Sequence, residues 1–518
     1  MTKSEKIQEM NLRSLSIQKV LETAGNKWPK RNFVYEKKHG EYVPKTFAEF
    51  TQDSKNLAEF LLSKKLGGQQ IAILGDNSYN FMVADMAVMG YVGVSVTLNS
   101  MWGVKDCQRA MKILDAKVFF YDNRHQNIAR ELKKIYPKIE FIKLEDIAEI
   151  AKGFNAEPKI AETDTTKLSK IIFSSGTTSV PKAVMLSQKN MFAGINSLLR
   201  RTGFTTSEIT YLFMPLCHVF GGICSFLYSL VGGCPIYLSS GKEHILEELK
   251  EIKPTAFSVV PLMLEIIYAG IDDQTKAKAK KAMKLSNFLL LFKIDIRRKL
   301  FKKLHEGFGG ELKYLFCSGA KLDNEIKQFF KDAGVNLLEA YASTETAASL
   351  ALEYPSSKKL DSAGTIYEDI DVKIDSPNAA GIGEILVRGD SVCLGYYKND
   401  KANEQAFDRD GYFRMGDLGF MDQSRGIFLH GRKKRTILLS NGVNVYPDEI
   451  ERDLEGGCVR KVKVYEDKQK IVAEFYVTTG TKASKIKKLV AKYNEKSLEY
   501  WKIDDYEIVE YNEKSHLK

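Results

Sequence analysis

One stretch, residues 171–184, constrains this chain more than any other. It begins with an apolar run, Ile171–Phe173, whose length and branching are typical of a buried strand. Small and hydroxylated residues follow around Gly176, and Lys182 comes soon after. Hydroxyls and the backbone N–H groups of a tight turn suit the oxygens of a polyphosphate. The stretch therefore predicts a strand that feeds a phosphate-binding loop. The candidate ligands are Ser174, Ser175, Gly176, Thr177, Thr178 and Lys182.

A surface turn rich in Ser and Thr is the alternative interpretation of this stretch. Other phosphate loops fit it less well. A Walker loop needs Gly-x-x-x-x-Gly-Lys-Ser/Thr, whereas Val180 and Pro181 precede Lys182 and Ala183 follows it. A Gly-x-Gly-x-x-Gly sequence that opens a helix after a strand is also missing, which argues against a dinucleotide site.

Length, charge and cysteine content narrow the class of protein. At 518 residues the chain exceeds what one hydrophobic core usually serves, so we expect two or more domains. The 77 Lys and Arg against 66 Asp and Glu give a modest net charge of +11, and we expect no nucleic-acid partner. Seven cysteines without a Cys-x-x-Cys pair indicate a reduced protein without a zinc site. The polar start and the lack of a long apolar run predict a cytoplasmic location.

Helical and strand-like patterns alternate between residues 32 and 99. The apolar stripe of Thr46–Lys64 has helical spacing, and Gln70–Leu74 has the composition of a short buried strand. The segment Asn77–Asn99 repeats the alternation. Further along, Ser187 is a plausible N-cap of a helix that runs towards Arg201. This order predicts an α/β fold in which helices cover parallel sheets.

Several further segments carry chemical groups at defined spacings. They are Pro-Leu-Cys-His-Val-Phe-Gly-Gly from Pro215, Cys-Ser-Gly-Ala-Lys-Leu from Cys317, Glu-Ala-Tyr-Ala-Ser-Thr-Glu from Glu339, Gly-Asp-Leu-Gly from Gly416 and Gly-Arg-Lys-Lys from Gly431. Each alone is typical of a turn or a strand end. Together, and in this order, they resemble the motifs of the adenylate-forming superfamily, which includes acyl-CoA synthetases, luciferases and peptide-synthetase adenylation domains. The resemblance is closest to long-chain-fatty-acid–CoA ligases.

The chain departs from the pattern of this superfamily in its phosphate loop. Relatives have Ser-Ser-Gly-Thr-Thr-Gly-x-Pro-Lys-Gly-Val, whereas Ser179 and Ala183 stand here in place of two glycines. Ala342 likewise replaces a usual glycine. A Cβ at these positions restricts the backbone. We therefore expect reduced loop mobility, which bears on the rate more than on the class of reaction.

The resemblance implies a complete nucleotide site. It implies that Tyr341 stacks on adenine, that Thr344 binds the α-phosphate and that Glu345 holds Mg²⁺. A flat ring suits a base and a carboxylate suits a hard cation. Asp417 would accept hydrogen bonds from both ribose hydroxyls, and Arg432 would contact ribose and phosphate. The turn of Ser318, Gly319 and Ala320 would touch adenine through its backbone, and Glu339 and Ala340 are the remaining implied ATP-binding residues.

The resemblance also implies the domain organisation. A large N-terminal domain, residues 1–431, would contain the helix-covered parallel sheets and a small barrel-like subdomain. A small α+β C-terminal domain, residues 432–518, would move about a hinge at Lys434. Lys518 takes the position of the lysine that bridges the carboxylate and the α-phosphate, although Leu517 replaces a glycine. An exposed terminal Lys without a role is the alternative. The thiol tunnel would be lined by Ser440, Asn441 and Gly442.

The acid site is indicated by one histidine and by a missing charge. In relatives, the histidine at the position of His218 lies where the acyl and thiol sites meet, whereas a lone His in an apolar run is more often a core residue. Between Tyr211 and Gly241 there is no acidic residue. A buried ammonium needs a partner, so an α-amino acid substrate is not expected.

Residues 271–303 form a basic segment. It contains 11 basic and three acidic residues, and the apolar run Phe288–Phe292 lies within it. The pattern suggests a basic amphipathic helix on an anionic membrane surface, and a solvated helix face is the alternative.

These observations predict an acid–thiol ligase that uses ATP, Mg²⁺ and coenzyme A. A carboxylic acid, with a fatty acid as the first candidate, would become an acyl-adenylate and then a thioester, with release of pyrophosphate and AMP. One alternative is a free-standing enzyme that loads the phosphopantetheine of an acyl carrier protein. Another is a non-catalytic nucleotide-binding relative.

Overall fold

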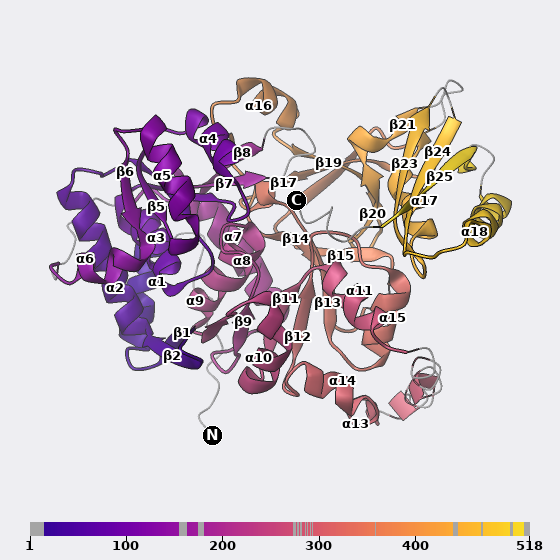
Figure 1. The fold of residues 1–518 in the computed structure, drawn as a ribbon, viewed down its shortest axis with the longest axis horizontal. Coiled ribbons are helices and arrows are strands. Elements are labelled where there is room, and N and C mark those ends of the chain that lie inside the picture. Colours follow the sequence, from indigo (N-terminus) through magenta and orange to yellow (C-terminus); the bar gives the residue numbers. More distant parts are fainter. Residues whose placement is uncertain are drawn as a thin grey trace. The chain divides into compact units, whose positions relative to one another are not determined.

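The protein divides into two compact units. In the computed structural model these are Met1–Asp371 with Arg388–Ala406, and Val372–Val387 with Phe407–Lys518. The structure describes residues 15–154, 163–174, 181–272, 276, 279, 282–284, 286, 289–290, 292, 294–357, 359–438, 444–467, 470–497 and 501–511. Each unit contains strands and helices (Figure 1) and its own buried apolar core.

The first unit contains a sheet with the strand order β18-β8-β7-β4-β3-β5-β6. Its strands are β3 (Gln70–Leu74), β4 (Val94–Leu98), β5 (Ala116–Tyr121), β6 (Glu140–Lys143), β7 (Leu168–Ser174), β8 (Lys182–Ser187) and β18 (Gly395–Tyr396). From β6 to β7 the neighbouring strands are parallel, whereas β8 runs antiparallel to both β7 and β18. The reversal places Lys182 opposite Ser174 and Tyr396 opposite Val184.

Helices pack on this sheet as the alternating pattern predicts. They are α3 (Tyr79–Ala87), α4 (Val104–Ile113), α5 (Gln126–Ile135) and α7 (Gln188–Thr202). Helix α2 (Phe47–Ser63) contacts α3, β1 and β2, and α6 (Ile147–Ala151) contacts α2. Strand β3 is buried along its whole length because α3 and other elements cover it. The predicted helix within Thr46–Lys64 and the predicted strand Gln70–Leu74 are confirmed. Ser187 caps α7, as predicted, through a capping box with Asn190.

A second sheet of the first unit has the order β15-β14-β13-β12-β11-β9-β10-β1-β2. Its strands are β1 (Asn32–Lys38), β2 (Glu41–Thr46), β9 (Thr210–Leu212), β10 (Ile236–Leu238), β11 (Ala256–Val259), β12 (Tyr314–Cys317), β13 (Leu337–Ala342), β14 (Ser349–Leu352) and β15 (Ser362–Ile366). The strands from β1 to β13 pair in parallel, and antiparallel strands flank them. Other helices of this unit are α1 (Ile17–Lys27), α8 (Val219–Gly221), α9 (Tyr228–Gly232), α10 (Ile245–Ile252), α11 (Pro261–Ala269), α15 (Asn324–Asp332) and α16 (Asp400–Ala406).

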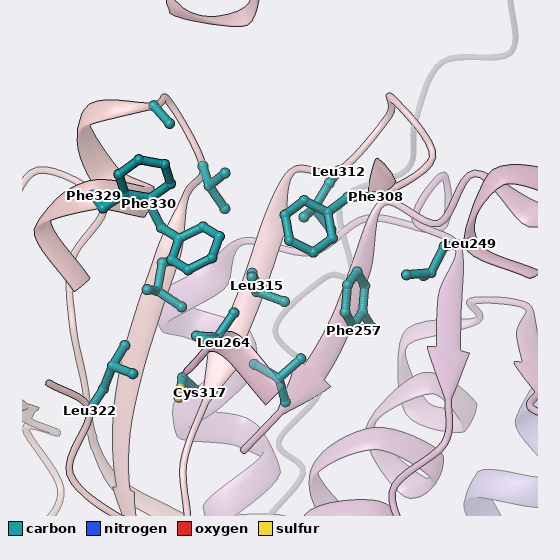
Figure 2. Packing of buried hydrophobic residues seen from close by; sticks show 14 of the residues in the cluster. Leu249, Phe257, Leu264, Phe308, Leu312, Leu315, Cys317, Leu322, Phe329 and Phe330 are labelled. Atoms are coloured by element: carbon teal, nitrogen blue, oxygen red, sulfur yellow. The ribbon is translucent and has the colours of Figure 1, made fainter. Parts of the chain in front are cut away.

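A buried apolar cluster covers one part of this second sheet. Phe257 on β11 and Leu315 and Cys317 on β12 pack with residues of α10, α11 and α15 (Figure 2). Leu322, which follows the turn after β12, belongs to the same cluster and is 1% exposed. The cluster therefore anchors both ends of the turn that, by the resemblance, is expected to touch adenine.

The basic segment differs from its prediction. Helix α13 (Arg297–Leu300) and helix α14 (Lys302–Gly307) are separate, and residues 294–296 are not helical. Asp295 accepts hydrogen bonds from the backbone N–H and the guanidinium of Arg297. Such local capture of the backbone competes with helix continuation. The prediction of one amphipathic helix is therefore wrong for this part of the segment.

The second unit contains further strands and, within its described residues, the α-helices α17 and α18. Strands β16 (Asp371–Asp375), β17 (Gly383–Arg388), β19 (Phe413–Met421) and β20 (Gly426–Arg432) follow the order β16-β17-β19-β20. Beyond them lie β21 (Ile437–Leu438), β22 (Asn444–Val445), α17 (Pro447–Leu454), β23 (Val459–Asp467), β24 (Lys470–Val477), α18 (Ala483–Lys496) and β25 (Asp505–Glu510). The α/β class is confirmed, whereas the barrel-like subdomain and the domain boundary at residue 432 stay predictions. Within the described residues, no helix combines the length and apolarity needed to cross a bilayer.

Candidate functional site

The candidate phosphate loop is anchored by the hairpin of β7 and β8. Ser174 ends β7 and Lys182 begins β8, and the two residues are paired. The predicted ligands Ser175, Gly176, Thr177 and Thr178 lie outside the described residues. Ala183 is 3% exposed and packs in the apolar core beneath the hairpin. Its Cβ therefore contributes to the core where relatives have glycine.

A tyrosine connects the loop strand to the candidate metal ligand. The Lys182 ammonium lies 4.2 Å from the centre of the Tyr396 ring. The Tyr396 hydroxyl donates a hydrogen bond of 3.0 Å to Oε1 of Glu345. Burial, followed by the neighbouring Glu345 carboxylate, raises the pKa of Tyr396, so the phenol stays protonated and donates. Sequence reasoning missed Tyr396, because a Gly-Tyr-Tyr sequence carries no signal of this contact.

Glu345 is suited to hold a magnesium ion. It lies in the short helix η7 (Thr344–Thr346), and its backbone carbonyl accepts a hydrogen bond of 2.7 Å from the Cys393 N–H. Among the described residues, only Oε1 of its carboxylate receives a hydrogen bond. Mg²⁺ commonly takes one or two carboxylates together with phosphate oxygens and water. The donor set around Glu345 thus fits a metal that arrives with a triphosphate, and within the described residues no cluster of three or more potential metal ligands is present.

The candidate adenine turn follows β12. The Ser318 hydroxyl donates to the Ala340 carbonyl at 2.9 Å, which connects the turn to β13. Gly319 has a φ of +99°, a conformation that favours glycine, and both Gly319 and Ala320 are exposed. Tyr341, the residue before the last of β13, is 6% exposed. The structure therefore brings the turn and the Glu339–Thr346 motif together on adjacent strands.

A buried ionic cluster supports this turn from behind. Lys327 on α15 contacts Glu339 at 2.7 Å and Glu353 at 2.9 Å, and all three side chains are at most 4% exposed. Lys331 adds a contact of 3.1 Å to Glu353. Glu339 also accepts a hydrogen bond of 3.4 Å from the Leu322 N–H. Burial raises the pKa of Glu339. For Lys327, burial alone would lower the pKa, but the two neighbouring glutamates raise it above its ordinary value.

This cluster bears on the predicted role of Glu339. Its carboxylate is engaged by Lys327, and its backbone exchanges hydrogen bonds with Glu353. A nucleotide contact of Glu339 stays a prediction. In the structure, Glu339 supports the candidate adenine turn through its contact with Leu322. One feature of the sequence could have indicated this cluster. Lys327 lies three residues before Phe330, which places a lysine on the apolar face of α15.

His218 lies at the start of α8 in a tightly packed turn. A Cβ on Gly221 would come within 2.2 Å of the Pro215 carbonyl oxygen, so the turn requires glycine there. Asn77 holds the preceding segment by donating to the Met214 carbonyl at 2.9 Å and accepting from the Leu216 N–H at 2.8 Å. Burial lowers the pKa of His218, and the imidazole is therefore neutral at pH 7.

In the second unit, Asp417 and Arg432 are cross-strand neighbours on β19 and β20. Their side chains form an ion pair of 2.9 Å, and Asp417 is 7% exposed. The Arg432 N–H donates to Asp448 at 2.8 Å, while Lys434 is exposed. The structure thus brings the two predicted ribose ligands together. Ser440, Asn441, Gly442 and Lys518 lie outside the described residues.

A comparison with protein-family models identifies the family of this chain. The model described as AMP-binding enzyme matches residues 21–397, which is more than half of the chain. The chain belongs to the AMP-binding enzyme family. The match contains Ser174, Lys182, His218 and Glu345, and it ends before Asp417. It confirms the resemblance to the adenylate-forming superfamily that the motifs indicated.

Curated relatives of this AMP-binding enzyme include several fatty-acid ligases. The chicken (Gallus gallus) long-chain-fatty-acid–CoA ligase ACSBG2 is 23% identical over 88% of this chain and 66% of its own. FadD15 of Mycobacterium tuberculosis, a long-chain-fatty-acid–CoA ligase, is 26% identical over 80% of this chain and 74% of its own. Long-chain-fatty-acid–CoA ligase 1 of Saccharomyces cerevisiae is 27% identical over 68% of this chain and 54% of its own. The chain thus spans between about half and three quarters of the length of these relatives.

Solved structures share the fold of this AMP-binding enzyme. The o-succinylbenzoate CoA synthetase MenE of Bacillus subtilis, in complex with its acyl-adenylate intermediate, has a TM-score of 0.77 at 21% identity, covering 95% of this chain and 94% of its own. ATP-bound MatB of Rhodopseudomonas palustris has a TM-score of 0.79 at 17% identity, covering 96% and 95%. The likeness at this identity establishes the fold.

Proposed function

We propose that this AMP-binding enzyme uses ATP to join a carboxylic acid, with a fatty acid as the first candidate, to coenzyme A. The carboxylate oxygen attacks the α-phosphorus of ATP, the bond to the β-phosphate oxygen breaks, and pyrophosphate leaves. A thiol then attacks the acyl carbon of the acyl-adenylate and AMP leaves. The observation that carries this proposal is the arrangement of Lys182, Tyr396 and Glu345, which presents a cation and a carboxylate beside the candidate phosphate loop.

The proposed roles follow from charge and from geometry. Negative charge shifts onto the phosphate oxygens during the displacement, so Lys182 and the hydroxyl of Thr344 act electrostatically. When bound at Glu345, Mg²⁺ supplies neutralising positive charge to the phosphates. Lys518 is proposed to act at the same step. Asp417 offers two carboxylate oxygens to a vicinal diol, and Arg432 holds Asp417 in place.

The acid substrate is proposed from the environment of His218 and from the relatives. Residues 211–241 contain no carboxylate that could bind a substrate ammonium, and the neutral imidazole adds no charge there. MenE is named for o-succinylbenzoate, which is an aryl acid, whereas the curated relatives are named for long-chain fatty acids and favour a fatty acid here.

The acceptor thiol is proposed to be that of coenzyme A, on the names of the curated ligases. The phosphopantetheine of an acyl carrier protein is the second candidate. For the thiol step we propose that the segment beyond residue 432 turns about Lys434 and brings Ser440, Asn441 and Gly442 to the acyl-adenylate.

A peripheral membrane contact through residues 271–303 is proposed as part of this function, because a fatty acid resides in membranes. Phe292 is 63% exposed and Ile294 is 50% exposed, close in sequence to the cations of α13. Exposed apolar groups beside cations suit an anionic bilayer. Binding to vesicles that contain phosphatidylserine should weaken with added salt. Absent or salt-insensitive binding would remove this part of the proposal.

The deciding experiment is ATP–pyrophosphate exchange with fatty acids of graded length and with aryl acids. We expect exchange with at least one fatty acid, and a Glu345→Gln variant should reduce it by about a hundredfold or more because one metal ligand is lost. No exchange with any acid would contradict the proposed activity and favour a non-catalytic protein. Coenzyme A and an acylable carrier protein, offered side by side to the same preparation, identify the acceptor.

A further inference from the structure

Tyr396 lies on a short strand whose backbone is held from two sides. On one side, β18 pairs with β8, and the flanking Leu394 and Tyr397 N–H groups donate to the carbonyls of Met185 and Ala183. On the other side, the amide of Asn403 accepts from the Tyr396 N–H at 2.7 Å and donates to its carbonyl at 2.9 Å. The direction of the Tyr396 side chain is therefore set by its backbone, and the ring is 5% exposed.

The two parts of this side chain meet groups of opposite charge. The hydroxyl donates to Oε1 of Glu345 at 3.0 Å. The ring face lies 4.2 Å from the Lys182 ammonium, which is within the range of a cation–π contact. The two charged residues come from separate segments, since Lys182 begins β8 and Glu345 lies in η7. One phenol thus contacts both.

The segment before Tyr396 also holds the backbone of Glu345. Cys393 donates its N–H to the Glu345 carbonyl at 2.7 Å, so residues 393–396 fix this residue at its backbone and at its carboxylate. A carboxylate restrained at one oxygen presents the other in a defined direction. Restraint of this kind is what a metal ligand or a phosphate ligand requires to act without reorganisation.

We infer that Tyr396 is a positioning residue of the adenylation site, which orients the Glu345 carboxylate for metal-bound ATP through its hydroxyl and holds the Lys182 ammonium for the phosphates through its ring. The inference rests on the proposed function, from which it takes the roles of Glu345 and Lys182. It adds a prediction that the two contacts are separable, since the hydroxyl and the ring can be removed one at a time.

The test is ATP binding by the full chain, measured by calorimetry without an acid substrate, in excess Mg²⁺ and in EDTA. Tyr396→Phe keeps the ring and should weaken MgATP binding by about tenfold, because a hydrogen bond to a charged group is lost. Its affinity for ATP in EDTA should match that of the wild type. Tyr396→Leu should also weaken binding in EDTA, by about fivefold, because the cation–π contact is lost as well.

Tyr397→Phe is the matched control. Tyr397 is the next residue, and its hydroxyl also donates to a carboxylate, at 2.5 Å to Asp115, but the contact is on the surface. It should bind MgATP and ATP like the wild type. Equal MgATP affinity of Tyr396→Phe and the wild type, or an equal loss in Tyr397→Phe, would overturn the inference alone. A wild-type protein that binds ATP no better with Mg²⁺ than in EDTA would instead overturn the metal role in the proposed function, and the inference with it. Thermal unfolding of each variant verifies that it is folded.

Discussion

At the residue scale, Lys327 is a buried ionic support of the candidate adenine turn. It is 0% exposed and neutralises two buried glutamates. Removal of one partner of a buried ion pair leaves a charge without compensation and commonly costs about 3–5 kcal/mol. Lys327→Met should therefore lower the free energy of unfolding by roughly this amount in a urea titration.

Lys331→Met provides the comparison for this prediction. Lys331 contacts Glu353 as well, but its side chain is 15% exposed and Glu353 keeps Lys327. We expect a distinctly smaller loss of stability. Equal losses in the two variants would contradict the central place given to Lys327.

His218 makes a prediction about pH. Burial lowers its pKa in the folded chain, so below its ordinary value of about 6.5 the unfolded chain binds the proton more readily. The folded state therefore loses stability as the pH falls through that value. In His218→Gln this loss is absent, while His305, whose pKa burial also lowers, is common to both proteins. Urea unfolding at pH 7.5 and pH 5.5 should show the wild type losing more stability than the variant; parallel losses would contradict the buried, neutral state.

At the element scale, helix α7 connects the loop strand to the segment that carries Tyr396. The Ser187 hydroxyl accepts from the Asn190 N–H at 3.1 Å, and the Asn190 amide donates to the carbonyls of Asp390 and Val392. Ser187→Ala should cost about 1–2 kcal/mol because the cap is buried and reciprocal. Ser16→Ala removes the simpler cap of α1 and should cost less. Chemical denaturation of both variants compares the two caps.

The sequence could predict the elements whose signals are local. The apolar stripe of α2, the buried run of β3 and the cap of α7 are all contained within their own segments. The basic segment was predicted as one helix, because periodicity does not register the capture of the Arg297 N–H by Asp295. A single side chain can break a helix in this way even where the neighbouring residues favour helix.

The candidate site could be predicted only as far as its motifs reach. Motifs identified Lys182 and Glu345, yet Tyr396 lies 51 positions from Glu345 and meets it only because β18 pairs with β8. The ion cluster of Lys327 likewise depends on α15, β13 and β14 folding together. Contacts between distant segments are properties of the sheet order, which the alternation of helices and strands does not specify.

At the scale of the whole molecule, the proposed hinge at Lys434 is open to test. Lys434 is exposed and lies in the short helix η8 (Lys433–Arg435) of the second unit. Proline fixes its own φ and restricts the preceding residue. Lys434→Pro should leave ATP–pyrophosphate exchange within about twofold of the wild type and reduce thioester formation by about a hundredfold or more, if rotation here precedes the thiol step.

Lys434→Ala separates the backbone from the side chain in this prediction. It removes the ammonium but keeps the rotational freedom of the backbone, and both half-reactions should stay near the wild-type rate. Thioester formation followed by chromatography measures the second step. An unaffected overall rate in Lys434→Pro would place the hinge elsewhere.

The hairpin of β7 and β8 has a practical consequence. Ser174 and Lys182 are paired across the two strands. The segment between them therefore begins and ends at neighbouring positions of the sheet. We expect that this segment can be replaced by loops of different length or glycine content without disturbing the flanking strands. Chimeras made at this junction offer a way to tune turnover in one scaffold by grafting loops from its relatives.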